Sequence, residues 1–198
     1  MLISPYSTFV KAKLTYHLAA IAALALFAST SQPQQRSEHK KLPNFHQVNN
    51  KLYRGAQPKT GDLQELANLG IKTVVNLRGK GKGGLKEEQE AHRKGLRYFN
   101  VPLERAGRPR DADIEQVLSI INTPENQPVF VHCAQGVDRT GTVIAVYRIA
   151  HDGWTSEEAK AEANRYGMHP WELGMKNYIH DFYQRHTRQN QSGAIIPR

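Results

Sequence analysis

One ten-residue segment contains the residue types that could do chemistry in this sequence. It reads His132-Cys-Ala-Gln-Gly-Val-Asp-Arg-Thr-Gly141 and holds the only cysteine among 198 residues. An apolar strand is expected to run into Cys133, and a helix is expected to begin near Arg139. The backbone N–H groups of the loop and of the first helical turn can then converge on one point. Such a nest carries the partial positive charge of a helix N-terminus and binds a tetrahedral oxyanion.

A thiol and a guanidinium stand beside this predicted nest. Its positive charge favours the thiolate of Cys133, which is the nucleophilic form of cysteine. Arg139 offers a planar, two-pronged donor for two phosphate oxygens. Together these groups can transfer a phosphoryl group to sulfur and then to water. The alternative interpretation is a buried, inert cysteine at a strand end, which would leave the neighbouring glycines, arginine and threonine as coincidence.

The elements that must position this loop alternate between strand and helix patterns. Strands are expected at 45–54 (a strand or a hairpin), 71–77, 98–103 and 128–132, and a flexible basic loop at 79–84. Helices are expected at 61–69, 87–94, 111–122, 140–150, 155–166 and 170–186, with a proline opening the last one. This order predicts a single α/β domain with a central, mainly parallel sheet flanked by helices. In such sheets the site lies beyond the carboxyl ends of the strands, where Cys133 falls.

Length and composition limit the other possibilities. The chain has room for one ordinary domain and carries a formal charge of +9, which favours an anionic partner. Its single cysteine excludes an intramolecular disulfide and a zinc site built from cysteines. Five histidines show no metal-ligand spacing and are interpreted as surface or core residues: His92, His151, His169, His180 and His186.

The segment 132–141 resembles the signature loop of the cysteine-dependent protein tyrosine phosphatase superfamily, His-Cys-x-x-Gly-x-x-Arg-Ser/Thr-Gly, at every fixed position. Three flanking stretches resemble its compact dual-specificity branch, which includes bacterial members: Leu52-Tyr-Arg-Gly-Ala-Gln-Pro58, Gly70-Ile-Lys-Thr-Val-Val-Asn-Leu-Arg78 and Gly153-Trp-Thr-Ser-Glu-Glu-Ala159. The resemblance covers about 44–187. It implies the corresponding fold and a phosphatase for phosphotyrosine, and for phosphoserine or phosphothreonine, with no metal or organic cofactor.

The resemblance also implies a role for each residue of the loop. Cys133 would be the nucleophile, and Arg139 would bind phosphate and stabilise the transition state. Thr140 would assist departure of the sulfur, and His132 would order the loop from behind. Gly136 and Gly141 would permit the tight backbone path of the loop. The cradle would be formed by the backbone amides of Ala134, Gln135, Gly136, Val137, Asp138 and Arg139.

The general acid is left open by the sequence. Family members have an aspartate on the loop after the preceding strand, and here Glu104 and Arg105 stand at that place. Asp138, inside the cradle, is the other main candidate, since the myotubularins have a similar Asp-Arg-Thr triplet. Asp111 is a third, although an acid at a helix start has a structural explanation.

Basic residues in two predicted loops favour a negatively charged substrate. If the strands are parallel, the loops after two of them flank the cradle, and their basic side chains attract anions. These side chains are Arg78, Lys80 and Lys82 in the first loop and Arg105, Arg108 and Arg110 in the second. A solvated basic surface is the alternative. No nucleic-acid-binding motif is present, so the expected partner is a phosphorylated protein or another anionic phosphate ester. The alternatives are a phosphoinositide or inositol polyphosphate phosphatase and a phosphate-binding pseudophosphatase. The Arg-Thr-Gly sequence at the end of the loop disfavours a rhodanese-type sulfurtransferase.

The N-terminus has the pattern of a secretory signal peptide. Residues 1–31 contain Lys11 and Lys13, no acid, an apolar run at 18–28 and then small polar residues. The run is short for a membrane span. We therefore expect the protein to be exported, to the periplasm if the chain is bacterial. The alternative is that residues 1–31 stay uncleaved as a membrane anchor, and only in that case do we expect the protein to associate with a membrane. The remaining chain divides into a linker at 32–43, a catalytic domain at 44–187 and a flexible tail at 188–198.

Overall fold

The computed structural model describes residues 42–79 and 81–193. The predicted signal peptide and most of the predicted linker lie outside these residues. Within the described ranges, no helix is both long and apolar enough to span a membrane.

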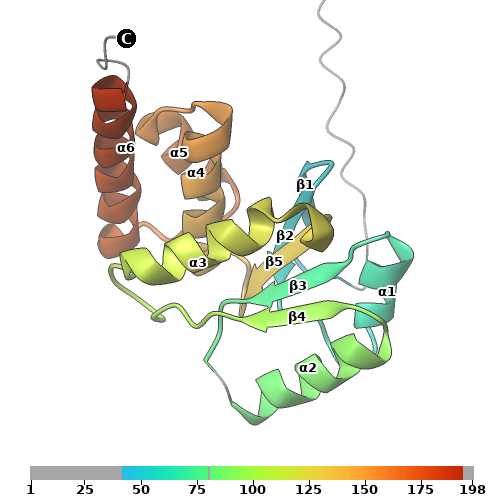
Figure 1. Ribbon diagram of the computed structural model, residues 1–198. Helices are drawn as coiled ribbons and strands as arrows, with labels where there is room; N and C mark the ends of the chain where they lie inside the picture. The colour runs from blue at the N-terminus through green and yellow to red at the C-terminus, as the bar shows by residue number, and fades with distance from the viewer. Residues whose placement is uncertain (1–41, 80, 194–198) are drawn as a thin grey trace, which may run out of the picture. The chain divides into compact units, whose positions relative to one another are not determined.

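A five-stranded sheet forms the centre of the fold (Figure 1). Its strands are β1 (His46–Asn49), β2 (Leu52–Ala56), β3 (Thr73–Asn76), β4 (Arg97–Asn100) and β5 (Val129–Cys133), in the order β1-β2-β5-β3-β4. Strand β1 pairs antiparallel with β2 as a hairpin, and the other neighbours are parallel. The predicted mainly parallel sheet is confirmed, and β5, which carries Cys133, is its middle strand.

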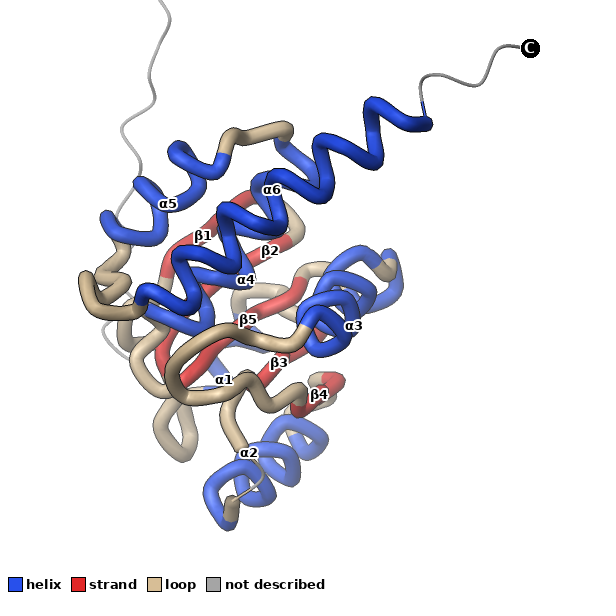
Figure 2. Tube along the Cα trace, turned by 90° about the vertical axis from the view of Figure 1, so that its left-hand side faces the viewer, coloured by secondary structure: helices blue, strands red, loops and turns tan. Residues whose placement is uncertain are grey.

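Helices cover both faces of this sheet (Figures 1 and 2). Helices α1 (Leu63–Asn68) and α2 (Lys82–Arg93) lie on one face, and α3 (Asp111–Asn122), α4 (Asp138–Asp152) and α6 (Leu173–Gly193) lie on the other. Helix α5 (Ser156–Arg165) packs against α4 and α6, and a short helical turn, η1 (Pro124–Asn126), precedes β5. The pattern of strands and helices confirms the predicted α/β class.

The alternation of side chains along β5 separates two sets of residues. Val129, Val131 and Cys133 belong to the core beneath α3, α4 and α6. Phe130 belongs to the opposite core, which includes residues of α1 and α2. Successive side chains of a strand point to opposite faces, so His132 points to the face away from Cys133. One strand therefore delivers a thiol to one side of the sheet and an imidazole to the other.

Two predicted boundaries were wrong. Helix α2 begins at Lys82, inside the expected loop at 79–84, and includes Gly83 and Gly84 despite their poor helix propensity. Its buried residues, Glu87, Glu90 and Ala91, lie further along, and packing of that face stabilises the helix as a whole. The last helix begins at Leu173 rather than at Pro170 and continues through 188–193, which were expected to be a frayed tail. The residues before it are used in a turn, in which the His169 backbone N–H donates to Asp138.

Candidate active site

The loop from Cys133 to Arg139 lies at the carboxyl end of β5, as predicted. Strand β5 ends at Cys133, and α4 begins at Asp138, close to the expected start near Arg139. Cys133 is only 2 % exposed, and its Sγ accepts the backbone N–H of Gly136 at 3.3 Å. A sulfur that accepts an N–H at the start of a helix lies in a field that favours negative charge.

Gly136 is required by both its conformation and its surroundings. Its φ of 72° is in the left-handed region, and a Cβ there would lie 2.4 Å from the backbone C and O of Gly55 in β2. The loop is tied to the β1–β2 side by two further bonds. The Gln57 N–H donates to the Ala134 carbonyl at 3.3 Å, and Asn44 Nδ2 donates to the Gln135 carbonyl at 3.0 Å. The conformation of the loop is thus fixed by hydrogen bonds from neighbouring segments as well as by its own glycine.

Arg54 of β2 lies behind this nest and is almost completely buried. Its Nη2 donates to the Gly136 carbonyl at 2.9 Å, and its guanidinium stacks over the Tyr166 ring at 4.5 Å. Its Nε and Nη1 have no hydrogen-bond partner within the described ranges. Burial lowers the Arg54 pKa to about 10, against the opposing influence of neighbouring acidic groups, so it remains a cation at neutral pH.

Arg139 and Thr140 begin the helix after the loop. Arg139 Nη1 donates to the carbonyl of Leu77, the residue after β3, at 3.3 Å. The Thr140 hydroxyl is buried and has no hydrogen-bond partner in the part of the chain that is described, so its contact with the Cys133 sulfur, implied by the family resemblance, is not formed here. Gly141 lies inside α4, where a Cβ would approach Met168 Cε at 3.2 Å.

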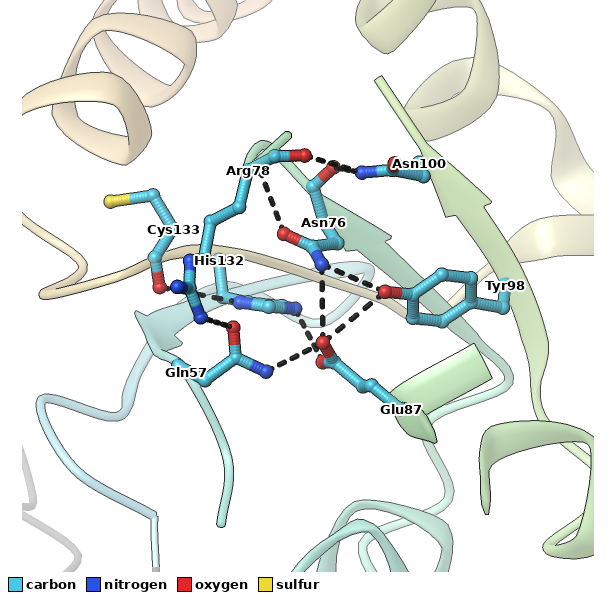
Figure 3. Close-up of polar contacts among 8 residues, drawn as sticks. All are labelled: Gln57, Asn76, Arg78, Glu87, Tyr98, Asn100, His132 and Cys133. Atoms are coloured by element: carbon cyan, nitrogen blue, oxygen red, sulfur yellow. Dashed lines mark hydrogen bonds and ion pairs between the residues drawn. The ribbon is translucent and has the colours of Figure 1, made fainter. Parts of the chain in front are cut away.

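On the opposite face, His132 is part of a buried polar network centred on Glu87 of α2 (Figure 3). His132 Nε2 lies 2.7 Å from Glu87 Oε1, and its Nδ1 lies 3.3 Å from the Cys133 carbonyl oxygen. Glu87 Oε2 accepts hydrogen bonds from Gln57 Nε2 (2.5 Å), Asn76 Nδ2 (3.1 Å) and the Tyr98 hydroxyl (3.2 Å). One carboxylate therefore joins groups from β3, β4, β5 and the segment after β2.

The charge of Glu87 is compensated by these partners. Burial raises its pKa, but the His132 imidazole and the bonds from Gln57 and Tyr98 outweigh that effect, and the pKa lies below its ordinary value. Burial and the nearby Glu87 raise the pKa of Tyr98 well above its ordinary value, so it stays a neutral donor. Gln57 extends the network to Arg78, whose Nη1 donates to Gln57 Oε1 at 2.6 Å.

The three carboxylates proposed as general acids lie in different settings. Asp138 is bound to His169: its Oδ1 accepts the His169 backbone N–H at 2.9 Å, and its Oδ2 lies 2.8 Å from His169 Nδ1. Asp111 Oδ1 accepts from the Tyr178 hydroxyl at 2.7 Å and from Arg185 at 2.8 Å, which fixes α3 to α6. Glu104 is exposed in the loop after β4.

The residue before Glu104 shares a backbone acceptor with Arg139. The preceding residue, Leu103, donates its N–H to the Leu77 carbonyl at 3.2 Å, and this oxygen also accepts from Arg139. The loop after β4 thus approaches the nest, as the parallel sheet predicts. Its far end is fixed to α6, since a Cβ on Gly174 would lie 2.6 Å from the Gly107 carbonyl carbon.

The basic residues expected to flank the nest are only partly available to a substrate. Arg108 pairs with Asp181 and Arg110 pairs with Asp113, so these charges are balanced locally. Arg105 and Lys82 are exposed, and Lys80 is outside the described residues. Residues 42–79 and 81–193 contain no cluster of three or more His, Cys, Asp or Glu side chains that could hold a metal ion.

Sequence reasoning missed two residues of this region. Glu87 gave no signal because its partners come from four separate segments, and only the fold brings them together. His169 was interpreted as an ordinary surface or core histidine, yet it binds Asp138 at the start of α4. Arg54 and Gln57, which follow each other closely in one flanking motif, both reach the loop.

The fold and the cysteine loop are those of the protein tyrosine phosphatase superfamily. Residues 20–181 match the family described as DSP-PTPase phosphatase fused to NAD+ kinase, and the chain belongs to this family. It is 32 % identical over 128 residues to the dual specificity protein phosphatase TpbA of Pseudomonas aeruginosa, covering 63 % of this chain and 55 % of that protein. It is 28 % identical over 109 residues to the inositol diphosphatase DSP4 of Arabidopsis thaliana, covering 53 % and 54 %. The chain spans about half the length of these relatives.

Solved structures agree with this assignment. The crystal structure of P. aeruginosa TpbA matches with a TM-score of 0.61 and 25 % identity, covering 73 % of this chain and 91 % of that one. The core catalytic domain of the PP-IP phosphatase SIW14 from S. cerevisiae, in complex with citrate, matches with a TM-score of 0.65 and 20 % identity, covering 77 % and 94 %. The second likeness supports the fold alone.

Proposed function

We propose that this chain hydrolyses phosphate monoesters, with phosphotyrosine and phosphoserine or phosphothreonine in proteins as substrates, through a phosphocysteine on Cys133. The observation that carries the proposal is the position of the Cys133 sulfur, which accepts the Gly136 N–H at the N-terminus of α4. A thiolate and a nest of backbone N–H groups at one point suit both the attack on phosphorus and the binding of its oxygens. A crystal structure of TpbA with its cysteine replaced holds phosphotyrosine, which supports this substrate class.

In the proposed first step, the Cys133 thiolate attacks phosphorus, the P–O bond to the leaving group breaks and the leaving oxygen takes up a proton. Backbone N–H groups of 134–139 bind the phosphoryl oxygens. Arg139 would leave the Leu77 carbonyl, a bond of 3.3 Å, and place its guanidinium on two of these oxygens. In the second step water attacks phosphorus, the S–P bond breaks and inorganic phosphate leaves.

Thr140 and the Glu87 network are proposed to support these steps. The Thr140 hydroxyl has no partner among the described residues, so it is free to turn toward the sulfur when negative charge returns there. His132, held between Glu87 and the Cys133 carbonyl, would keep the loop in the conformation that presents its N–H groups. Neither role requires contact with the substrate.

A second candidate substrate class is inositol phosphates, including diphosphates. Two relatives are named inositol diphosphatases. Two exposed cations follow the parallel strands β3 and β4, Lys82 and Arg105, and would attract additional phosphate groups. This candidate uses the same loop and the same chemistry on phosphorus.

The decisive measurement is phosphate release by the purified chain and its Cys133→Ser variant. The substrates are a phosphotyrosine peptide, a phosphoserine peptide and an inositol diphosphate, with thiocyanate formation as the control for sulfur transfer. We expect release from at least the phosphotyrosine peptide and none from the variant. A phosphate-binding protein without turnover would bind phosphate and release none, and undiminished release by the variant would exclude a phosphocysteine.

We also infer that residues 1–31 direct export to the periplasm of a bacterial host. The basic start, short apolar run and small polar exit support this. Expression of the full chain followed by cell fractionation and mass determination of the mature N-terminus tests it. A chain that retains residue 1 in the membrane fraction would indicate an anchor, and one that retains it in the cytosol would refute export.

A further inference from the structure

The segment 166–169, between α5 and α6, lies along the cysteine loop. The Tyr166 ring stacks on Arg54, whose Nη2 binds the Gly136 carbonyl. A Cβ on Gly167 would lie 3.0 Å from Val137 Cγ1, and Met168 Cε would contact a Cβ placed on Gly141. His169 then binds Asp138. Each residue of this segment thus contacts the loop or its direct support, so the segment is one wall of the site.

The contact between Asp138 and His169 has the geometry of an oriented imidazole. Asp138 Oδ2 and Oδ1 lie 2.8 and 3.0 Å from His169 Nδ1, and Oδ1 also accepts the His169 backbone N–H at 2.9 Å. A carboxylate can only accept, so Nδ1 must carry a proton. Nε2 is the ring nitrogen without a partner among the described residues, and the side chain is 32 % exposed. A carboxylate that fixes the tautomer and direction of a histidine is the arrangement found in acid–base dyads.

The other carboxylates considered for proton transfer are less suited. Both oxygens of Asp138 are occupied by His169, so Asp138 itself does not present a free acid to a ligand. Asp111 is bound by Tyr178 and Arg185. Glu104 is exposed and close enough to Arg110 to raise the pKa of that guanidinium, although Asp113 is the main cause. Histidine is the side chain that most often transfers protons near neutral pH.

We propose that His169, oriented by Asp138, is a catalytic residue and the general acid of the reaction proposed above, on which this role rests. As the Cys133 Sγ–P bond forms and the P–O bond breaks, Nε2 of the imidazolium gives its proton to the leaving oxygen, and the phenol or alcohol departs neutral. The imidazole that results keeps its proton on Nδ1, facing Asp138. In the second step Nε2 takes a proton from water as the water oxygen bonds to phosphorus and the S–P bond breaks.

Trp171 completes this arrangement. Its ring stacks on the His169 imidazole, with centroids 4.6 Å apart and an interplanar angle of 27°, while 71 % of the residue is exposed. The indole covers one face of the imidazole and so restricts its rotation. The imidazole is therefore held at Nδ1 by Asp138 and on one face by Trp171.

The test compares two substrates that differ in their need for a proton. Phosphotyrosine releases a phenol with a pKa of about 10, whereas para-nitrophenyl phosphate releases an anion stabilised by its nitro group. His169→Asn keeps an N–H near the Nδ1 position for Asp138 but cannot transfer a proton. We expect kcat on phosphotyrosine to fall by about 10²-fold or more, and kcat on para-nitrophenyl phosphate to fall less than about tenfold. Asp138→Asn should show the same selectivity with a smaller loss.

Controls separate this role from a structural one. His151→Asn, at the exposed far end of α4, should leave both rates unchanged. Added imidazole should restore phosphotyrosine hydrolysis to His169→Ala, which a misfolded protein would not allow. Equal losses on both substrates, no loss, or a selective loss in Glu104→Gln instead would overturn the assignment. A wild-type chain that releases no phosphate, or a fully active Cys133→Ser variant, would refute the proposed function itself.

Discussion

Replacement of Glu87 by glutamine tests whether the buried network holds the site together. The carboxylate is almost fully buried and joins four side chains, and its oxygen lies 2.7 Å from His132 Nε2. Leaving buried donors without their charged acceptor costs about 1–3 kcal/mol. Glutamine keeps the shape and some neutral hydrogen bonds, but several buried groups share the one carboxylate, so we expect a loss of roughly 3 kcal/mol, at the upper end of that range. For a chain of this size this lowers Tm by about 6–12 °C.

The same variant has a distinct dependence on pH. The folded-state pKa of Glu87 is lowered, because its bonded partners outweigh the burial that would raise it. A lowered carboxyl pKa stabilises the fold above the unfolded value, 4.5, and this contribution is lost as the pH falls through the folded value. The difference in unfolding free energy between the wild type and Glu87→Gln should be full near pH 7 and shrink below about pH 4.5.

The assay is urea unfolding followed by circular dichroism at a series of pH values, with Glu88→Gln as the matched control on the same helix. Glu88 is part-exposed and belongs to none of the described hydrogen bonds of the network. We expect the control to unfold within about 0.5 kcal/mol of the wild type. Equal unfolding midpoints for the two variants, or a difference that grows as the pH falls, would refute the reasoning.

Three further changes test the surroundings of the loop. Gly136→Ala, which combines a left-handed φ with a contact of 2.4 Å to Gly55, should cost more than about 1 kcal/mol and abolish phosphate release, measured by thermal unfolding and by activity. Arg54→Met should lower kcat/KM by on the order of tenfold to hundredfold, because the bond to the Gly136 carbonyl is lost. Its free energy of unfolding should change little, because a buried charge is also removed. A loss of stability that accompanies the loss of kcat/KM would contradict this. Thr155→Ala removes the capping box of α5 and should lower Tm by about 2–4 °C at unchanged activity; an unchanged Tm would show that the cap is not needed.

Local patterns in the sequence were sufficient for the architecture and for the centre of the site. The apolar run before Cys133 indicated a central strand, and β5 is the middle strand of the sheet. The capping box at Thr155 and the helix Asp111–Asn122 also appear where their patterns indicated. These features depend on residues close together in the chain, so propensity and spacing predict them.

Features that depend on distant contacts were not predictable in the same way. Helix α2 begins within a stretch whose glycines indicated a loop, and the delayed start of α6 accompanies the turn in which His169 binds Asp138. Asp138 could be identified as important from its place in the loop, but its partner lies 31 residues away. A sequence indicates which residues can exchange a proton, whereas only the fold shows which of them face each other.

The close approach of Gly174 to Gly107 has a mechanical consequence. The loop after β4, which carries Glu104, and the wall segment 166–169, which precedes α6, both meet the start of that helix, and no side chain separates the two backbones there. Arg108 of this loop also pairs with Asp181, about two turns further along α6. A rotation of α6 would therefore displace both walls of the phosphate site together. The position of α6 thus couples the loop after β4 to the segment 166–169.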